Sequence, residues 1–190
     1  MLTPMARVSV QDLAARARKA QPRSGRTRVV LIDGPAGSGK TTLAARVGGE
    51  LGAQVVHGDD IYEGWDGLAT MWPILGHGIL EPLARMEHGA FGRWDWHEGS
   101  RAETIPVPVA DALVIEGVGV AQRLARPYAS LVIYVEAPWE LRIARGIERD
   151  GERMRAQWEQ WNAREDRFLA DEGTRGAADV IVDGSLPYLD

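Results

Sequence analysis

The residues best suited to chemistry lie in one glycine-rich segment. Gly34-Pro35-Ala36-Gly37-Ser38-Gly39-Lys40-Thr41 has two glycines separated by four residues and followed by Lys and Thr, the pattern of a phosphate-binding loop. Such glycines let successive backbone N–H groups point at phosphate oxygens, Lys40 supplies a positive charge, and the hydroxyl of Thr41 can ligate Mg²⁺. The sequence therefore predicts that the phosphates of a nucleotide and Mg²⁺ bind here, without deciding between ATP and GTP, and that the nucleotide is held by Gly34, Ala36, Gly37, Ser38, Gly39, Lys40, Thr41 and Thr42.

Carboxylates follow two other apolar runs. Asp59 and Asp60 come shortly after Val55-Val56, and Glu116 comes directly after Leu113-Val114-Ile115. Ligands of an open parallel sheet sit at the carboxyl ends of its strands, so these acids are expected near the phosphate loop. Glu116 then suits a metal-holding role, and one of the two aspartates suits a general base that accepts a hydroxyl proton. A helix N-cap or a loop acid is the alternative for the aspartates.

Four arginines are spaced as one face of a helix. Arg142, Arg145, Arg149 and Arg153 step by three, four and four residues. Like charges at this spacing destabilise an isolated helix, and a bound anion would reverse the effect. A solvated face balanced by nearby acids explains the charge equally well. The position after an apolar strand favours an arginine-bearing lid that closes over phosphates.

Tryptophans are numerous, at seven in the chain. Trp158 and Trp161 are three residues apart in a helical pattern, and core packing is the default interpretation for them. Trp94 and Trp96 flank Asp95 in a segment that reads as extended, where alternate residues share a face, so they are better candidates for contacting a ligand. The four histidines show no metal-ligand spacing and are expected on the surface or in hydrogen bonds.

Elements of two kinds alternate along the chain and must position these residues. Continuous apolar runs, typical of strands buried on both faces, occur at residues 29–32, 55–56, 113–115, 131–135 and 180–182. Helical patterns separate them at residues 41–51, 79–87, 139–150 and 155–171. This alternation predicts an α/β fold with a doubly wound parallel sheet of about five strands. Residues 58–100, rich in Gly and Trp, fit neither pattern and are expected to form loops around a ligand.

Composition limits the other choices. The chain has 190 residues, 22 basic against 27 acidic side chains and a net charge of −5, as expected for one globular domain rather than a disordered or nucleic-acid-binding tail. The absence of cysteine excludes disulfides, thiol nucleophiles and Cys-ligated zinc. No signal-peptide pattern and no long apolar run occur, so we expect a cytoplasmic protein without a membrane partner. Residues 1–28 read as a helix, started by Ser9, and a linker, and residues 29–190 as the domain.

Taken together, residues 29–183 resemble the uridine kinase and phosphoribulokinase family of P-loop kinases. Gly58-Asp59-Asp60-Ile61-Tyr62 is similar to its Gln-Asp-Ser-Phe-Tyr, which implies that Asp59 is the catalytic base and Tyr62 a substrate contact. Trp94-Asp95-Trp96-His97-Glu98-Gly99-Ser100-Arg101 is similar to the family's nucleoside-positioning motif, and Ile115-Glu116-Gly117-Val118 to the motif whose Glu helps hold Mg²⁺. The arginines from Arg142 to Arg155 resemble its lid. The resemblance implies a P-loop NTPase fold with a lid at about residues 139–172.

The sequence also departs from the family pattern, mostly on the acceptor side. The family's histidine in the nucleoside motif aligns with Gly99, and its Asp-His-Pro-x-x-Phe-Asp segment is missing. The lid is one residue shorter, and Gly146 stands where the family has one of its paired arginines. Because the phosphate side is nearly intact, ATP-dependent phosphoryl transfer is the firmer implication, and the nucleoside acceptor the weaker one.

The resulting expectation is a small-molecule kinase that uses ATP and Mg²⁺. Lys40, Asp59, Arg149 and Arg153 are expected in catalysis, Arg145 and Arg155 on the nucleotide, Thr41 and Glu116 on the metal, and Tyr62, Trp94, Asp95, Trp96 and Arg101 on the acceptor. One alternative is a nucleoside monophosphate kinase that binds its acceptor phosphate through Arg85, Arg93 and Arg101. Another is a nucleotide-binding regulatory protein without transfer activity. A nucleic-acid partner is not expected, and self-association is left open.

Overall fold

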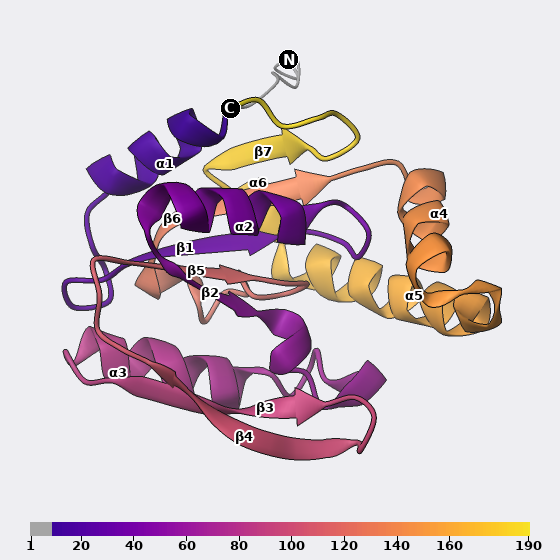
Figure 1. Cartoon of the computed structure of the whole chain (residues 1–190), viewed down its shortest axis with the longest axis horizontal. Helices are drawn as coiled ribbons and strands as arrows, with labels where there is room; N and C mark the ends of the chain where they lie inside the picture. The colour runs from indigo at the N-terminus through magenta and orange to yellow at the C-terminus, as the bar shows by residue number, and fades with distance from the viewer. Residues whose placement is uncertain (1–8) are drawn as a thin grey trace.

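Five parallel strands form the central sheet in the order β2-β5-β1-β6-β7 (Figure 1). The computed structural model describes residues 9–190. The strands are β1 (Arg28–Asp33), β2 (Gln54–His57), β5 (Ala112–Glu116), β6 (Ala129–Glu136) and β7 (Val180–Asp183). Each neighbouring pair is parallel, and β1 lies in the middle between β5 and β6. This is the doubly wound α/β sheet that the apolar runs predict.

Helices cover both faces of this sheet. They are α1 (Val10–Lys19), α2 (Lys40–Leu51), α3 (Glu81–Ala84), α4 (Trp139–Asp150), α5 (Arg155–Glu172) and α6 (Thr174–Ala177), with shorter turns η1 (Gly58–Asp60), η2 (Gly64–Asp66), η4 (Arg126–Tyr128) and η5 (Glu152–Met154) and the π-helical segment η3 (Pro73–Leu80). The helices predicted at residues 41–51, 139–150 and 155–171 correspond to α2, α4 and α5. No helix among residues 9–190 is long and apolar enough to cross a bilayer.

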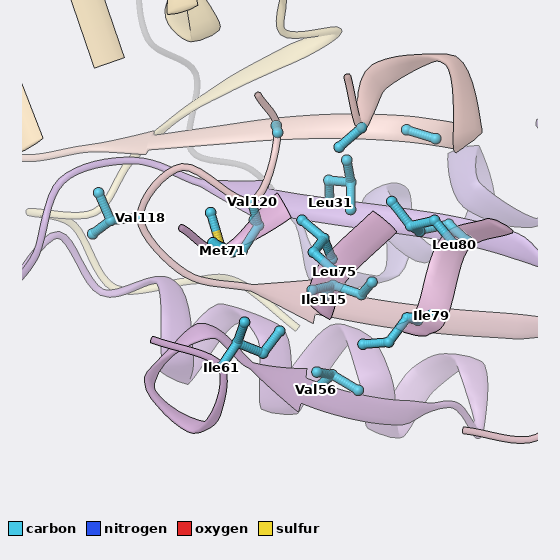
Figure 2. Packing of buried hydrophobic residues seen from close by; sticks show 14 of the residues in the cluster. Leu31, Val56, Ile61, Met71, Leu75, Ile79, Leu80, Ile115, Val118 and Val120 are labelled. Carbon is cyan, nitrogen blue, oxygen red and sulfur yellow. The ribbon is translucent and has the colours of Figure 1, made fainter. Parts of the chain in front are cut away.

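Alternate residues of β1 face opposite layers, because side chains of a strand alternate between its two faces. Val30 and Ile32 pack with residues of α1 and α2. Val29 and Leu31 pack on the other face against η3, α3 and α5. Figure 2 shows part of this second layer, where Leu31 and the buried side chains of η3 meet. The central strand is therefore buried on both sides, and its carboxyl end carries the phosphate loop.

The amino-terminal helix is part of the packed structure. The Ser9 hydroxyl accepts a hydrogen bond from the Asp12 N–H at 3.4 Å, as the capping pattern predicts. Val10, Leu13 and Ala17 are buried against α2 and the face of the sheet that α2 covers. Residues 1–8 of the predicted segment 1–28 lie outside the described residues. The helix thus docks on the core.

Residues 58–100 are more ordered than the loops that we expected. They contain η1, η2, η3, α3 and the strand β3 (Gly89–Asp95), which pairs with β4 (Ser100–Val107) in an antiparallel hairpin (Figure 1). The helix expected at residues 79–87 instead begins at Pro73 and ends at Ala84. Glycines weaken the helical pattern here, and one of them, Gly76, is required because a Cβ would lie 2.5 Å from the Trp72 ring. The hairpin carries candidate acceptor residues.

Candidate functional site

One cavity of about 520 Å³ lies at the carboxyl ends of β1, β2 and β5, with α4, η5 and α5 along its other side. Its volume is in the range of small-molecule sites. Four segments line it: the phosphate loop, the ends of β2 and β5 with the turns that follow them, the β3–β4 turn and the lid. The lining residues are Ala36, Gly37, Lys40, Thr41, Asp59, Tyr62, Trp65, Trp96, Glu116, Gly117, Val118, Arg149, Asp150, Arg153, Met154, Trp158 and Trp161.

The phosphate loop is held in a shape that only glycine permits. Gly37 and Gly39 have φ angles of 76° and 100°, and a Cβ on Gly37 would lie 2.5 Å from the backbone carbonyl of Arg142. Lys40 is 6% exposed, and its ammonium donates one hydrogen bond to the Pro35 carbonyl at 2.9 Å. Since an ammonium has three donors, two are left for a ligand in the cavity.

Only part of the predicted nucleotide set lines this cavity. Ala36, Gly37, Lys40 and Thr41 do, whereas Gly34, Ser38 and Gly39 form the remainder of the loop. The buried hydroxyl of Ser38 has no hydrogen-bond partner within residues 9–190, so it can bond to a ligand of the loop. Thr42 is exposed and lies outside the cavity lining. The loop fits an anion, and the contact assigned to Thr42 stays a prediction.

The loop is tied to the end of β5 by a buried carboxylate. Asp33 accepts hydrogen bonds from the N–H groups of Gly34 at 2.6 Å, Gly119 at 2.8 Å and Ala121 at 2.8 Å. Burial raises the pKa of Asp33 to about 6, although these three donors lower it. The first residue of the phosphate loop is thereby fixed relative to the segment that follows Glu116.

Thr41 and Glu116 come together as predicted for the metal pair. The Thr41 hydroxyl donates to Glu116 Oε1 at 3.2 Å. His57 Nδ1 lies 2.8 Å from the same oxygen, and this hydrogen bond raises the pKa of His57. Mg²⁺ bound with a nucleotide takes one or two protein ligands, with phosphates and water completing its shell, so one hydroxyl and one carboxylate fit it. Within residues 9–190, no cluster of three or more His, Asp or Glu suits a metal ion.

Asp59, rather than Asp60, lines the cavity. It lies in η1 directly after β2, so the strand end delivers its carboxylate beside the phosphate loop. Solvent reaches it through the cavity, while the surrounding protein desolvates the carboxylate and raises its pKa. The neighbouring Glu116 raises this pKa further, and Lys40 lowers it. A carboxylate of raised basicity that faces the cavity can accept a proton there.

The expected arginine face is split by the end of α4. The helix stops at Asp150, and Gly151, with a φ of 89°, carries Arg153 away from the face. Arg149 and Arg153 line the cavity. Arg149 pairs with Asp150 at 2.7 Å and stacks on the Trp158 ring at 5.5 Å. These two arginines are therefore the positive charges that the lid brings to the cavity.

The other lid arginines make contacts elsewhere. Arg145 donates to the carbonyls of Gly37 at 3.1 Å and Gly184 at 3.0 Å, so it braces the phosphate loop from outside the cavity. Arg155 pairs with Glu152 and also lies outside the lining. Their expected contacts with the nucleotide stay predictions.

Two of the predicted acceptor residues line the cavity. The Tyr62 ring does so while its hydroxyl donates to the Val118 carbonyl at 2.7 Å. Trp96 lines it too, and its indole N–H donates to the backbone carbonyl of Asp59 at 2.8 Å. The Trp96 side chain is therefore joined to the segment that carries the candidate base.

Trp94, Asp95 and Arg101 lie outside the cavity lining. β3 ends at Asp95, whose carboxylate accepts the N–H groups of two following residues, so the chain turns and Trp94 and Trp96 do not share a face. Arg101 stacks over Trp94 at 5.3 Å and donates to the Ile61 carbonyl at 2.8 Å. It holds the hairpin against the turn after η1. Acceptor contacts for these three residues stay predictions.

Three tryptophans at the cavity were not among the predicted site residues. Trp158 and Trp161 are buried, as core packing requires, yet both also line the cavity. Trp65, from η2, lies between Trp96 and Trp161, with ring centroids 5.5 and 5.7 Å apart. The glycine- and tryptophan-rich composition of residues 58–100 was the signal for Trp65. The helical spacing of Trp158 and Trp161 predicts that they are buried, but it does not distinguish residues that line a cavity from residues of the core.

Comparison with known proteins identifies the fold. No protein-family profile and no curated protein matches the chain. Among solved structures, a possible uridine kinase from Bacillus stearothermophilus is 24% identical with a TM-score of 0.64, covering 92% of this chain and 97% of its own. A proposed fructose transport system kinase from Silicibacter sp. TM1040 is 19% identical with a TM-score of 0.63, covering 92% and 98%. The chain therefore has the α/β fold of these P-loop kinases, as its phosphate-loop motif predicts.

Proposed function

We propose that the protein transfers the γ-phosphoryl group of ATP to a hydroxyl group of a small molecule, with Mg²⁺ as cofactor. The observation that carries the proposal is that Lys40, the Thr41–Glu116 pair and Asp59 line one cavity. A protein that only binds nucleotides needs the first two features. A carboxylate with a raised pKa facing the same space is what a kinase needs in addition.

Asp59 would act as the general base. Its carboxylate takes the proton of the acceptor hydroxyl as the hydroxyl oxygen bonds to the γ-phosphorus and the bond to the β,γ-bridging oxygen breaks, which leaves ADP. Asp59 is then protonated and returns its proton to water. Mg²⁺, held by Thr41 and Glu116, would neutralise charge on the phosphate oxygens.

Lys40, Arg149 and Arg153 supply the positive charge around the transferred group. Lys40 is fixed by its hydrogen bond to the loop, and Arg149 by Asp150 and the Trp158 ring. Preorganised cations lower the barrier because they stabilise the charge of the transition state without reorganising. The rings next to Arg149 reduce the space for water beside the reacting group.

A nucleoside is the first candidate acceptor, which the resemblance to uridine kinases supports. The alternative of a nucleoside monophosphate kinase needs arginines for the acceptor phosphate. Arg85 pairs with Glu87, Arg93 with Glu103 and Arg101 with Glu63, and none of the three arginines lines the cavity. The monophosphate acceptor is therefore the weaker candidate.

The test is a metabolite screen with ATP and Mg²⁺ that records the mass of the product rather than ADP release, because uncoupled hydrolysis also releases ADP. We expect a product heavier by one phosphoryl group. Asp59→Asn should lose transfer while still binding ATP, and Lys40→Ala should lose turnover. Asp60→Asn is the matched control, since Asp60 does not line the cavity. ATP binding without any phosphorylated product would leave the regulatory alternative.

A further inference from the structure

Four aromatic side chains line the part of the cavity next to Asp59, which we call the acceptor half, and together they form an aromatic wall. Neighbouring rings meet edge to face or tilted, with centroids 5.5 Å apart at 70° for Trp96 and Trp65, 5.7 Å apart at 76° for Trp65 and Trp161, and 5.6 Å apart at 54° for Trp161 and Tyr62. These rings come from four segments, namely the β3–β4 turn, η2, α5 and the turn after η1, which converge to build the wall. Trp158 and Met154 extend it from the lid side.

The polar ends of several of these rings are already occupied. The Trp96 indole N–H donates to the Asp59 carbonyl, the Tyr62 hydroxyl to Val118, and the Trp158 indole N–H to Asp150. No Asn, Gln, Ser or His side chain of the described residues lines this cavity. The amides of Gln157 and Gln160 belong to a separate pocket of about 180 Å³. The wall thus offers rings with few polar groups that could read the edge of a base.

Three cations and three acids line the cavity, and two of the acids have partners there: Glu116 accepts a hydrogen bond from Thr41, and Asp150 pairs with Arg149. The cations Lys40, Arg149 and Arg153 come from the phosphate loop and the lid. Asp59, the acid of the acceptor half, lies beside Trp96, whose indole binds its backbone. A second anionic group on the acceptor would lie near this carboxylate and would compete with ATP for the same three cations. Polyols would lose hydrogen bonds to water without gaining partners from the rings.

We propose that the acceptor is an uncharged molecule whose flat ring packs against the rings of Trp65, Trp96 and Trp161 and whose hydroxyl reaches Asp59, and that this aromatic packing rather than base-edge hydrogen bonding selects it. The inference rests on the proposed phosphoryl transfer and adds the substrate class. It implies that a purine and a pyrimidine nucleoside are used with similar efficiency. Stacking is tolerant of ring identity because every such ring has a π face.

Kinetics with four acceptors of known chemistry test this class. The probes are uridine, adenosine, fructose and uridine monophosphate, each with saturating ATP and Mg²⁺. We expect kcat/KM values for the two nucleosides within about tenfold of each other, and fructose and the monophosphate at least about tenfold poorer. Preference for fructose or the monophosphate, or a hundredfold discrimination between the two bases, would overturn the inference.

A substitution in the aromatic wall provides a second test of the inference. Trp65 is half-buried, and no hydrogen bond joins it to Asp59 among the described residues, so Trp65→Leu removes a ring and leaves the hydrogen bond between Trp96 and Asp59 in place. We expect the acceptor KM to rise about three- to tenfold, the worth of one aromatic stacking interaction, with the ATP KM unchanged. Trp65→Phe should restore most of the affinity. The matched control is Trp139→Leu, because Trp139 is 46% exposed and lies outside the cavity. An acceptor KM unchanged in Trp65→Leu would contradict the role of the wall.

Calorimetric titration of the same probes, with a non-hydrolysable ATP analogue present, separates this inference from the proposed function. Nucleoside binding that weakens in Trp65→Leu, without any phosphorylated product, would overturn the transfer activity and retain the ring-binding class. Failure of both nucleosides to bind would overturn the ring-binding class.

Discussion

Glu165 on α5 accepts a hydrogen bond from the backbone N–H of Ala36 in the phosphate loop, at 2.8 Å. Its other carboxylate oxygen accepts from the guanidinium of Arg142 on α4, also at 2.8 Å, and Asn162 accepts from the same guanidinium at 2.9 Å. All three side chains are buried. The two lid helices are therefore joined to each other and to the phosphate loop at their base, while Arg149 and Arg153 lie farther along the chain at the cavity.

Glu165→Gln should raise the ATP KM more than it lowers kcat. The carboxylate accepts from the Ala36 N–H and from the Arg142 guanidinium, whereas a glutamine would present its NH₂ group to one of these two donors. An unsatisfied buried donor costs about 1–3 kcal/mol. If the Ala36 N–H in the phosphate loop loses its acceptor, this cost corresponds to about 5- to 150-fold in ATP affinity. Glu159→Gln, an exposed change on the same helix, is the control. Steady-state kinetics at varied ATP, with thermal unfolding in parallel, measure the two effects. Lower stability with unchanged ATP KM would assign Glu165 a purely structural role.

Much of the fold could be predicted from sequence, because the strands of a parallel sheet are apolar on both faces. The run at residues 131–135 became β6, and the helix predicted at residues 139–150 became α4 with the same bounds. The Thr41–Glu116 contact followed from the rule that parallel strands end at one edge of the sheet.

The acceptor side could not be predicted in the same way, since long-range packing determines it. The separation of Trp94 from Trp96 depends on the turn that Asp95 caps, which an alternating pattern does not reveal. Likewise, the sequence places Arg142 and Arg149 on one face of a helix. In the structure Arg142 is buried in an ion pair with Glu165, whereas Arg149, near the end of α4, lines the cavity. Regular spacing in a sequence predicts which residues share one face of a helix, but it does not predict which other elements pack on that face.

Activity should fall on acidification at a pH above the ordinary range of an aspartate. Asp59 must be ionised to accept a proton, and desolvation, with Glu116 as second cause, raises its pKa. The acid limb of the kcat/KM profile should therefore have its midpoint above about 3.9, the usual aspartate value. Rates between about pH 4.5 and 8 measure it, with circular dichroism to show that the protein stays folded. Extending the series to about pH 3.5 brings the usual aspartate value into the range, and an acid limb with its midpoint at or below that value would contradict the role of Asp59 as the base.

The protein should be more stable near pH 6 than near pH 8. The pKa values of Asp33 and Glu165 are raised to about 6 by burial, so the folded state binds protons that the unfolded state releases. His57, whose pKa is raised by Glu116, acts in the same direction. This stabilisation is complete below the unfolded pKa values and is lost as pH rises through about 6.

The two buried acids together contribute about 1 kcal/mol at pH 6 and about 2–3 kcal/mol at pH 5 relative to pH 8. Urea unfolding at these pH values measures the change, and equal stability at pH 6 and pH 8 would contradict it.

Gly146 is expected to tolerate no larger residue, because Trp158 packs directly on it. A Cβ at this position would lie 2.4 Å from the Trp158 ring, although the backbone is ordinary helix. Gly146→Ala should lower the free energy of unfolding by about 1–3 kcal/mol, the usual cost of overpacking, although alanine is the better helix former. Because Trp158 also supports Arg149 at the cavity, a displaced ring should lower kcat as well.

Gly49→Ala in α2 is the matched control: a Cβ there meets nothing within 4 Å, so the same change should stabilise the protein slightly. Equal effects of the two substitutions on stability would show that the contact between Gly146 and Trp158 does not constrain the lid.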